Sequence, residues 1–119
     1  METHKSLIVW QKSISFVITI YNLTKSFPRN EMYGIVSQIR RAAVSIPSNI
    51  AEGCARRNTR EYIQFLYVSL GSAAEIETHL IISSNLNFII KGETERLHNE
   101  LEEILRMLTG LIKSLSNRE

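Results

Sequence analysis

The stretch Gln38–Gly53, QIRRAAVSIPSNIAEG, decides the fold of this 119-residue chain. Apolar residues recur through it at a spacing of three or four, which is the period of one helical face: Ile35, Ile39, Ala42, Ile46 and Ile50. At about 100° per residue, Arg40 and Arg41 lie on the opposite side of that helix. Pro47 has no N–H and its ring clashes with the carbonyl four residues back, so we expect a kink there.

Helical periodicity extends over most of the chain, which has only two prolines and five glycines to interrupt it. We predict helices over residues 5–26, from 31 or 33 to 55, 59–84 and 93–116. The first helix should bury a stripe of Leu7, Trp10, Ile14, Val17 and Tyr21, broadened by Phe16 and Ile18. The last should bury Leu97, Leu101, Ile104, Leu108, Leu111 and Leu115.

Short connections between the helices make antiparallel neighbours the simplest topology. The predicted fold class is therefore all-α: one domain over residues 1–119, an antiparallel up-down four-helix bundle with its second helix kinked near Pro47.

The third helix is apolar on two sides. Its core face carries Tyr62, Leu66, Ser69, Ala73, Ile76 and Leu80. Its second face has no charge and carries Tyr67, Leu70, Gly71, Ala74 and Thr78. Glycine costs about 1 kcal/mol relative to alanine in a helix interior, so Gly71 indicates that another surface approaches closely. We expect this face to be the interface of a homo-oligomer.

Composition describes an ordinary globular protein, with 44% hydrophobic and 22% charged residues. The single Cys54 cannot form an internal disulfide, which fits a reducing compartment. The start of the chain lacks the pattern of a signal peptide, and no run reaches the roughly 18 apolar residues of a membrane span. We expect a cytoplasmic protein that does not contact a membrane.

Charge is unevenly distributed along the chain. Residues 1–60 carry nine Lys and Arg against three Glu, whereas residues 61–119 carry five against nine. The basic half supplies candidate phosphate ligands for RNA or DNA: Arg40, Arg41, Arg56, Arg57 and Arg60. Guanidinium groups bind phosphate in a bidentate manner and stay charged, so such binding would be independent of nucleotide sequence and sensitive to salt.

A structural interpretation of the same arginines remains open. Glu52 precedes Arg56 by four residues, the favourable order for a helical ion pair, and Glu75 could pair with Arg41 or Arg40. Cations such as Arg56 and Arg57 also suit the negative end of a helix dipole.

The central stretch resembles the signature of small bacterial proteins encoded in intervening sequences of 23S rRNA genes, also called S23 ribosomal proteins. The resemblance extends to Val9-Trp10, Phe27-Pro28, Glu61-Tyr62, Phe65-Leu66, Gly71-Ser72, Glu75, Met107-Leu108 and Gly110-Leu111. It implies an up-down four-helix bundle that assembles into a ring-like pentamer. The chain is also similar to the accessory protein of diversity-generating retroelements, which binds nucleic acid and a reverse transcriptase.

Motifs of catalysis and cofactor binding are absent from the sequence. There is no phosphate-binding loop, dinucleotide fingerprint or nucleophile elbow, and the chain has no Asp. A di-metal bundle needs paired Glu-x-x-His motifs, and only Glu95 and His98 have that spacing. We therefore expect a non-enzyme with neither a metal nor a cofactor.

Two functions follow from these patterns. The first is a homo-oligomeric scaffold that binds RNA or DNA electrostatically; the second is a protein-interaction scaffold whose basic half contacts an acidic protein or the neighbouring subunit. Arginines free of acidic partners would favour the first. We expect Pro47, Ser48 and Asn49 to serve assembly geometry rather than ligand binding.

Overall fold

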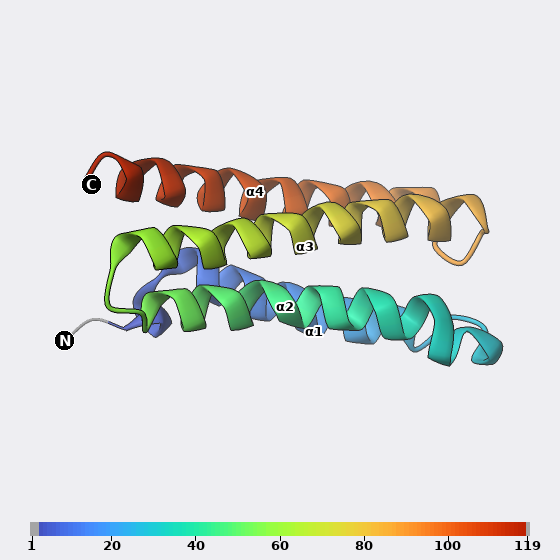
Figure 1. Ribbon diagram of the computed structural model, residues 1–119. Helices are drawn as coiled ribbons and strands as arrows, with labels where there is room; N and C mark the ends of the chain where they lie inside the picture. Colours follow the sequence, from blue (N-terminus) through green and yellow to red (C-terminus); the bar gives the residue numbers. More distant parts are fainter. Residues whose placement is uncertain (1–2, 119) are drawn as a thin grey trace.

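Four long helices make up most of residues 3–118, the part of the chain that the computed structural model describes (Figure 1). They are α1 (Ile8–Thr24), α2 (Ser37–Cys54), α3 (Thr59–Asn85) and α4 (Lys91–Ser116). Short helical turns, His4–Ser6, Arg29–Glu31 and Met32–Val36, precede α1 and α2. These residues contain no strand, and the prediction of an all-α four-helix bundle is confirmed.

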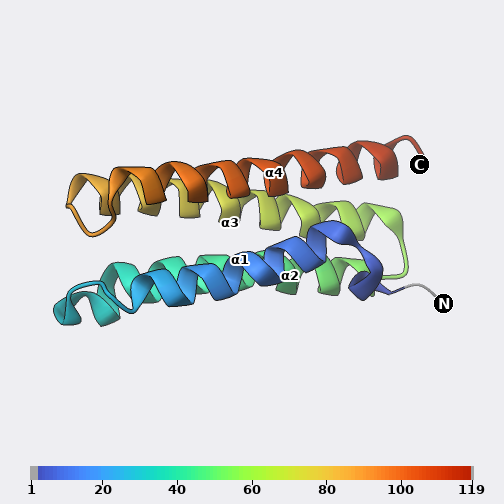
Figure 2. The ribbon, with the colours of Figure 1, turned by 180° about the vertical axis from the view of Figure 1, so that it is seen from behind.

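Successive long helices run in opposite directions along an elongated bundle of 46 × 23 × 20 Å (Figures 1 and 2). The start of the described chain, the α2–α3 connection and the end of α4 therefore lie at one end of the molecule. The α1–α2 and α3–α4 connections lie at the other end, where the rings of Phe27 and Phe88 pack with their centroids 5.4 Å apart. No helix within residues 3–118 combines the length and the apolar character of a membrane span.

The buried face of α1 differs from the predicted stripe. Its buried residues are Val9, Ser13, Phe16, Ile20 and Thr24. Ile14 and Tyr21, predicted to be in the core, are exposed. Two polar residues can occupy the core because the hydroxyls of Ser13 and Thr24 donate to backbone carbonyls three and four residues earlier, at 2.8 Å each. A stripe chosen by side-chain hydrophobicity alone misses this face.

The other predicted core faces agree closely with the structure. On α3, Leu66, Ser69, Ala73, Ile76 and Leu80 are buried as predicted, while Tyr62 lies at the boundary. On α4 one position differs, because Ile112 is buried in place of Leu111. The 3.6-residue period of a straight helix accounts for this difference, since the position four residues after Leu108 returns to the core face.

The second helix runs without interruption through Pro47, which is buried. The kink that the structure does contain lies at Gly34 in the preceding turn, where φ is −105° and ψ is −115°. The expected kink near Pro47 stays a prediction.

The contact between α2 and α3 is hydrogen-bonded as well as apolar. The buried hydroxyl of Ser69 donates to the carbonyl of Ile46 at 2.9 Å, directly before Pro47. The hydroxyl of Ser72 donates to that of Ser45 at 2.8 Å. Short side chains are needed for these two contacts because they connect α2 and α3 at close range. Within α2, the Asn49 amide donates to the Ser45 carbonyl at 2.8 Å.

Gly53 lies at the closest approach of these helices. A Cβ atom built there would lie 2.8 Å from the Cβ of Phe65 and 3.1 Å from the carbonyl oxygen of Tyr62. Glycine is therefore required at this position by the close approach of α3. Burial at this contact, together with the neighbouring Cys54, raises the pKa of Tyr62 to about 12.

We predict that Gly53→Ala lowers the free energy of unfolding. The added methyl group would overlap a Cβ and a backbone oxygen that cannot rotate away, and such overpacking costs about 1–3 kcal/mol. This cost exceeds the gain of about 1 kcal/mol in helix propensity. Urea denaturation followed by circular dichroism measures the difference.

The matched control is Gly110→Ala on α4, where a Cβ would meet no atom within 4 Å. This variant should be as stable as the wild type or more stable by up to about 1 kcal/mol. A Gly53→Ala protein that is as stable as Gly110→Ala would contradict the close approach.

Candidate nucleic-acid interface

The structure brings together three of the five candidate arginines. Arg56 and Arg57 lie in the connection between α2 and α3, and Arg60 lies in the first turn of α3. This connection is at the end of the bundle shared by both ends of the described chain (Figure 1). Arg41 lies three turns or more before Cys54, the last residue of α2, and is therefore roughly 20 Å along the axis from the connection at about 1.5 Å per residue. The five arginines do not form one surface.

Arg40 belongs to the packing of α2 against α1. Its guanidinium lies 4.6 Å from the centroid of the Tyr21 ring, and its Nε donates to the Thr24 hydroxyl at 2.9 Å. Its Nη2 also donates to the carbonyl of Tyr21 at 3.3 Å. Arg40, expected on the side of α2 opposite its apolar stripe, therefore has its guanidinium against an aromatic ring and a buried hydroxyl of α1. We exclude Arg40 from the candidate interface.

Arg41 is exposed beside a shallow hollow of about 380 Å³ between α2 and α3. The hollow is lined by Gln38, Arg41, Ala42, Ser45, Ser72 and Glu75. The expected ion pair of Glu75 with Arg41 or Arg40 does not form within the described protomer, where Glu75 pairs with His79 at 3.2 Å. A carboxylate in the same hollow repels phosphate, so Arg41 is a weaker candidate than the arginines at the end of the bundle.

Two contacts position Arg56. Its Nη2 lies 3.8 Å from a carboxylate oxygen of Glu52, which confirms the predicted pair, and its guanidinium lies 4.7 Å from the centroid of the Phe65 ring. The side chain is still 42% exposed. A guanidinium that stacks on a ring keeps its N–H edges available, so Arg56 can contact a phosphate without leaving Phe65.

Arg57 and Arg60 are exposed, and neither has a carboxylate within 4.0 Å among residues 3–118. Asn58 caps α3 by accepting a hydrogen bond from the backbone N–H of Glu61 at 2.9 Å. The carboxylate of Glu61 supplies the favourable negative charge of the first turn. Arg60 occupies the same turn, where the positive end of the helix dipole disfavours a cation. Helix stability therefore does not explain Arg60.

Sequence reasoning missed two cations at this end of the bundle, Lys113 and Arg118. Both are exposed near the end of α4, which finishes beside the α2–α3 connection (Figure 1). The predicted antiparallel topology could have indicated these two cations, because it places the last turn of α4 at the same end of the bundle as the α2–α3 connection.

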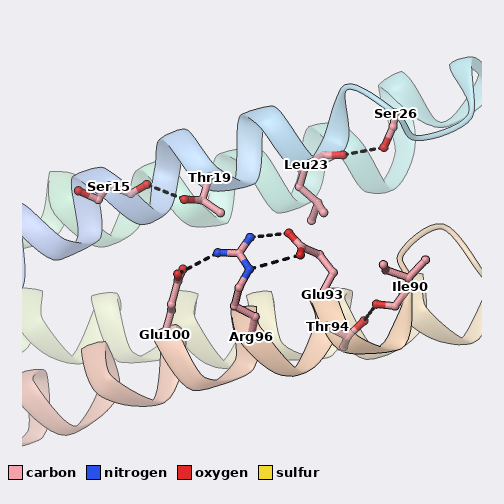
Figure 3. Close-up of polar contacts among 9 residues, drawn as sticks. All are labelled: Ser15, Thr19, Leu23, Ser26, Ile90, Glu93, Thr94, Arg96 and Glu100. Carbon is pink, nitrogen blue, oxygen red and sulfur yellow. Dashed lines mark hydrogen bonds and ion pairs between the residues drawn. The ribbon is translucent and has the colours of Figure 1, made fainter.

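Other cations pair with acidic residues elsewhere on the bundle. Figure 3 shows Arg96 of α4 between the carboxylates of Glu93 and Glu100, and Lys12 of α1 pairs with Glu103. The hydrogen bond from Arg96 lowers the pKa of Glu93, and the bond from Lys12 lowers that of Glu103. Among the described residues, Arg57 and Arg60 at the α2–α3 connection therefore differ from Arg96 and Lys12, whose charges are paired with carboxylates.

The predicted oligomer face of α3 is open in the protomer. Gly71, Ala74 and Thr78 are exposed, and Tyr67 is 58% exposed, while Leu70 packs partly against the core. A Cβ atom at Gly71 would meet nothing within 4 Å. Nothing within the described protomer therefore requires glycine at this position.

Comparison with known proteins agrees with the fold and with the sequence signature. The family model of the 23S rRNA-intervening sequence protein matches residues 5–110. A search of curated proteins finds no match. A crystal structure from Bacteroides thetaiotaomicron VPI-5482, described as a protein with unknown function from the S23 ribosomal protein family, superposes with a TM-score of 0.83. It is 29% identical, and the match covers 89% of this chain and 96% of that one.

The family match covers most of the chain and includes the whole of Gln38–Gly53, and the family has no assigned enzymatic activity. The protein belongs to the family of 23S rRNA-intervening sequence proteins.

Proposed function

We propose that this protein is a non-enzymatic, homo-oligomeric scaffold that binds RNA or DNA electrostatically through one end of its bundle. The observation that carries the proposal is the pair Arg57 and Arg60, which is exposed and without an acidic partner among residues 3–118. Arg56, held on Phe65, extends this basic end, as do Lys113 and Arg118. Such a surface contacts the phosphate backbone and reads no base sequence.

Self-assembly is the second part of the proposal, with the pentamer that the family resemblance implies. A closed ring with an odd number of subunits needs two different faces that fit each other. The open face of α3 is one candidate, and a groove of about 280 Å³ between α1 and α2 is another. This groove is lined by His4, Trp10, Ile14, Val17, Val44, Pro47, Ser48 and Ala51.

Assembly would strengthen binding without any new contact. Each subunit of a ring presents the same basic end, so a long polyanion can engage several copies at once. Linked weak contacts raise overall avidity by about 10²–10⁴ when the geometry allows simultaneous engagement. This explains how a few arginines per subunit could suffice.

We predict that Arg57→Ala/Arg60→Ala weakens binding to single-stranded RNA and to duplex DNA. Loss of each phosphate contact should reduce the slope of log K against log salt by about 0.9 on duplex DNA and about 0.7 on single strands. Fluorescence anisotropy over a series of salt concentrations measures both quantities.

The control for charge is Lys91→Ala/Arg106→Ala, which removes two cations from α4 away from the basic end. It should leave the salt slope close to that of the wild type. If the wild-type oligomer binds neither polymer at low salt, the nucleic-acid function is wrong, and an acidic protein partner becomes the alternative to test.

A second prediction concerns assembly. Gly71→Arg should reduce the mass in solution to that of the 13.7 kDa protomer, because the arginine would project from the open face of α3. Helix content should not change, since this position is in open space in the protomer. Light scattering and circular dichroism provide the two readouts.

Gly110→Arg is the matched control, because it makes the same change at an exposed glycine of α4 with no atom near its Cβ. It should keep the wild-type mass. A Gly71→Arg protein that also keeps the wild-type mass would exclude this face of α3 from the interface.

A further inference from the structure

Three potential metal ligands from two helices converge on one side of the bundle. Glu77 comes from α3, and His98 and Glu102 come from adjacent turns of α4. One ligand atom from each residue lies within 4.8 Å of the other two. All three residues are partly buried, so neighbouring residues restrict the rotation of their side chains.

The distance between the side-chain ligand atoms of Glu77 and His98 is compatible with a cation that bridges α3 and α4. Nδ1 of His98 lies 3.4 Å from Oε2 of Glu77, which is beyond the usual 2.7–3.2 Å of an N–H···O hydrogen bond. Zinc binds imidazole nitrogen and carboxylate oxygen at about 2.0–2.2 Å, so two ligands of a tetrahedral ion lie about 3.3 Å apart. The observed separation, which also permits an ion pair between a protonated His98 and Glu77, is therefore compatible with two ligands of one zinc ion.

The charges around the cluster also favour a cation. Three other carboxylates of α4 have basic partners, since Glu93 and Glu100 contact Arg96 and Glu103 contacts Lys12. Glu77 and Glu102 have no Lys or Arg nitrogen within 4.0 Å among residues 3–118. Two carboxylates that close together repel each other, and a divalent ion between them would remove that repulsion.

We propose that Glu77, His98 and Glu102 form a site for a divalent transition-metal ion, with Zn²⁺ as the best-matched candidate. The site joins α3 to α4. One imidazole with two carboxylates is a ligand set that suits zinc, and three protein ligands leave a fourth position for water. A groove lined partly by Glu77, Thr94, Glu95 and His98 gives solvent access to that position.

This site differs from the Glu-x-x-His motif of di-metal helix bundles. The one example of that spacing in the sequence pairs Glu95 with His98. The cluster instead uses His98 and Glu102 with three residues between them, which places both on one face of α4. The third ligand comes from α3, and only the antiparallel pairing of the two helices brings it near.

Isothermal titration of the metal-free oligomer with ZnCl₂ tests the proposal. We expect one zinc ion per protomer, with binding weakened more than about tenfold in His98→Gln and in Glu77→Gln, since loss of even a supporting partner costs a site roughly 10–100-fold. Zinc should also raise the melting temperature of the wild type, because binding to the native state stabilises it, and should do so much less in either variant. Circular dichroism before zinc addition establishes that the variants are folded.

Glu75→Gln is the matched control, because it changes the other Glu–His contact of α3, in which Glu75 lies 3.2 Å from His79. It should bind zinc as the wild type does. The proposal is overturned if the wild type does not bind zinc, if His98→Gln binds it with unchanged affinity, or if Glu75→Gln removes the binding instead.

Discussion

The close packing of α2 against α3 is the constraint on which the rest of the structure depends. The two helices approach until Gly53 has no room for a side chain, and the buried hydroxyl of Ser69 bonds to the carbonyl that precedes Pro47. Ser45 accepts a hydrogen bond at its hydroxyl from Ser72 and one at its carbonyl from Asn49. Small and hydrogen-bonding residues are required here because larger ones would separate the backbones. The family signature is thus a set of packing residues for most of its length.

This packing decides which residues remain available to partners. Arg40, inside the signature, is held against α1 by Tyr21 and Thr24. The arginines that follow the signature lie beyond the last turn of α2 and are exposed. Likewise, α3 uses one face against α2 and α4 and presents the other, around Gly71, to the outside. The exposed arginines at this end and the open face of α3 are in this sense consequences of how α2 and α3 fit together.

Much of the fold could be predicted from periodicity, and the exceptions have physical causes. The core faces of α3 and α4 can be predicted because Leu and Ile recur at helical spacing. The core face of α1 cannot, since it includes Ser13 and Thr24, whose buried hydroxyls bond to carbonyls of their own helix. The role of Arg40 depended on an aromatic ring 19 residues earlier, which no local pattern reveals. For the same reason the cluster of Glu77, His98 and Glu102 could not be read from spacing, because its members meet only across two helices.

The central claim is that the signature maintains the fold while residues outside it bind the polyanion. The most direct measurement is made on one variant, Ser45→Ala, whose free energy of unfolding and affinity for RNA are determined together. Because Ser45 joins the two helices through Ser72, the variant should lose about 0.5–1.5 kcal/mol of stability. Its affinity for RNA should equal that of the wild type under conditions in which both are folded. Unchanged stability with a large loss of affinity would contradict the claim and would place the binding site within the signature itself.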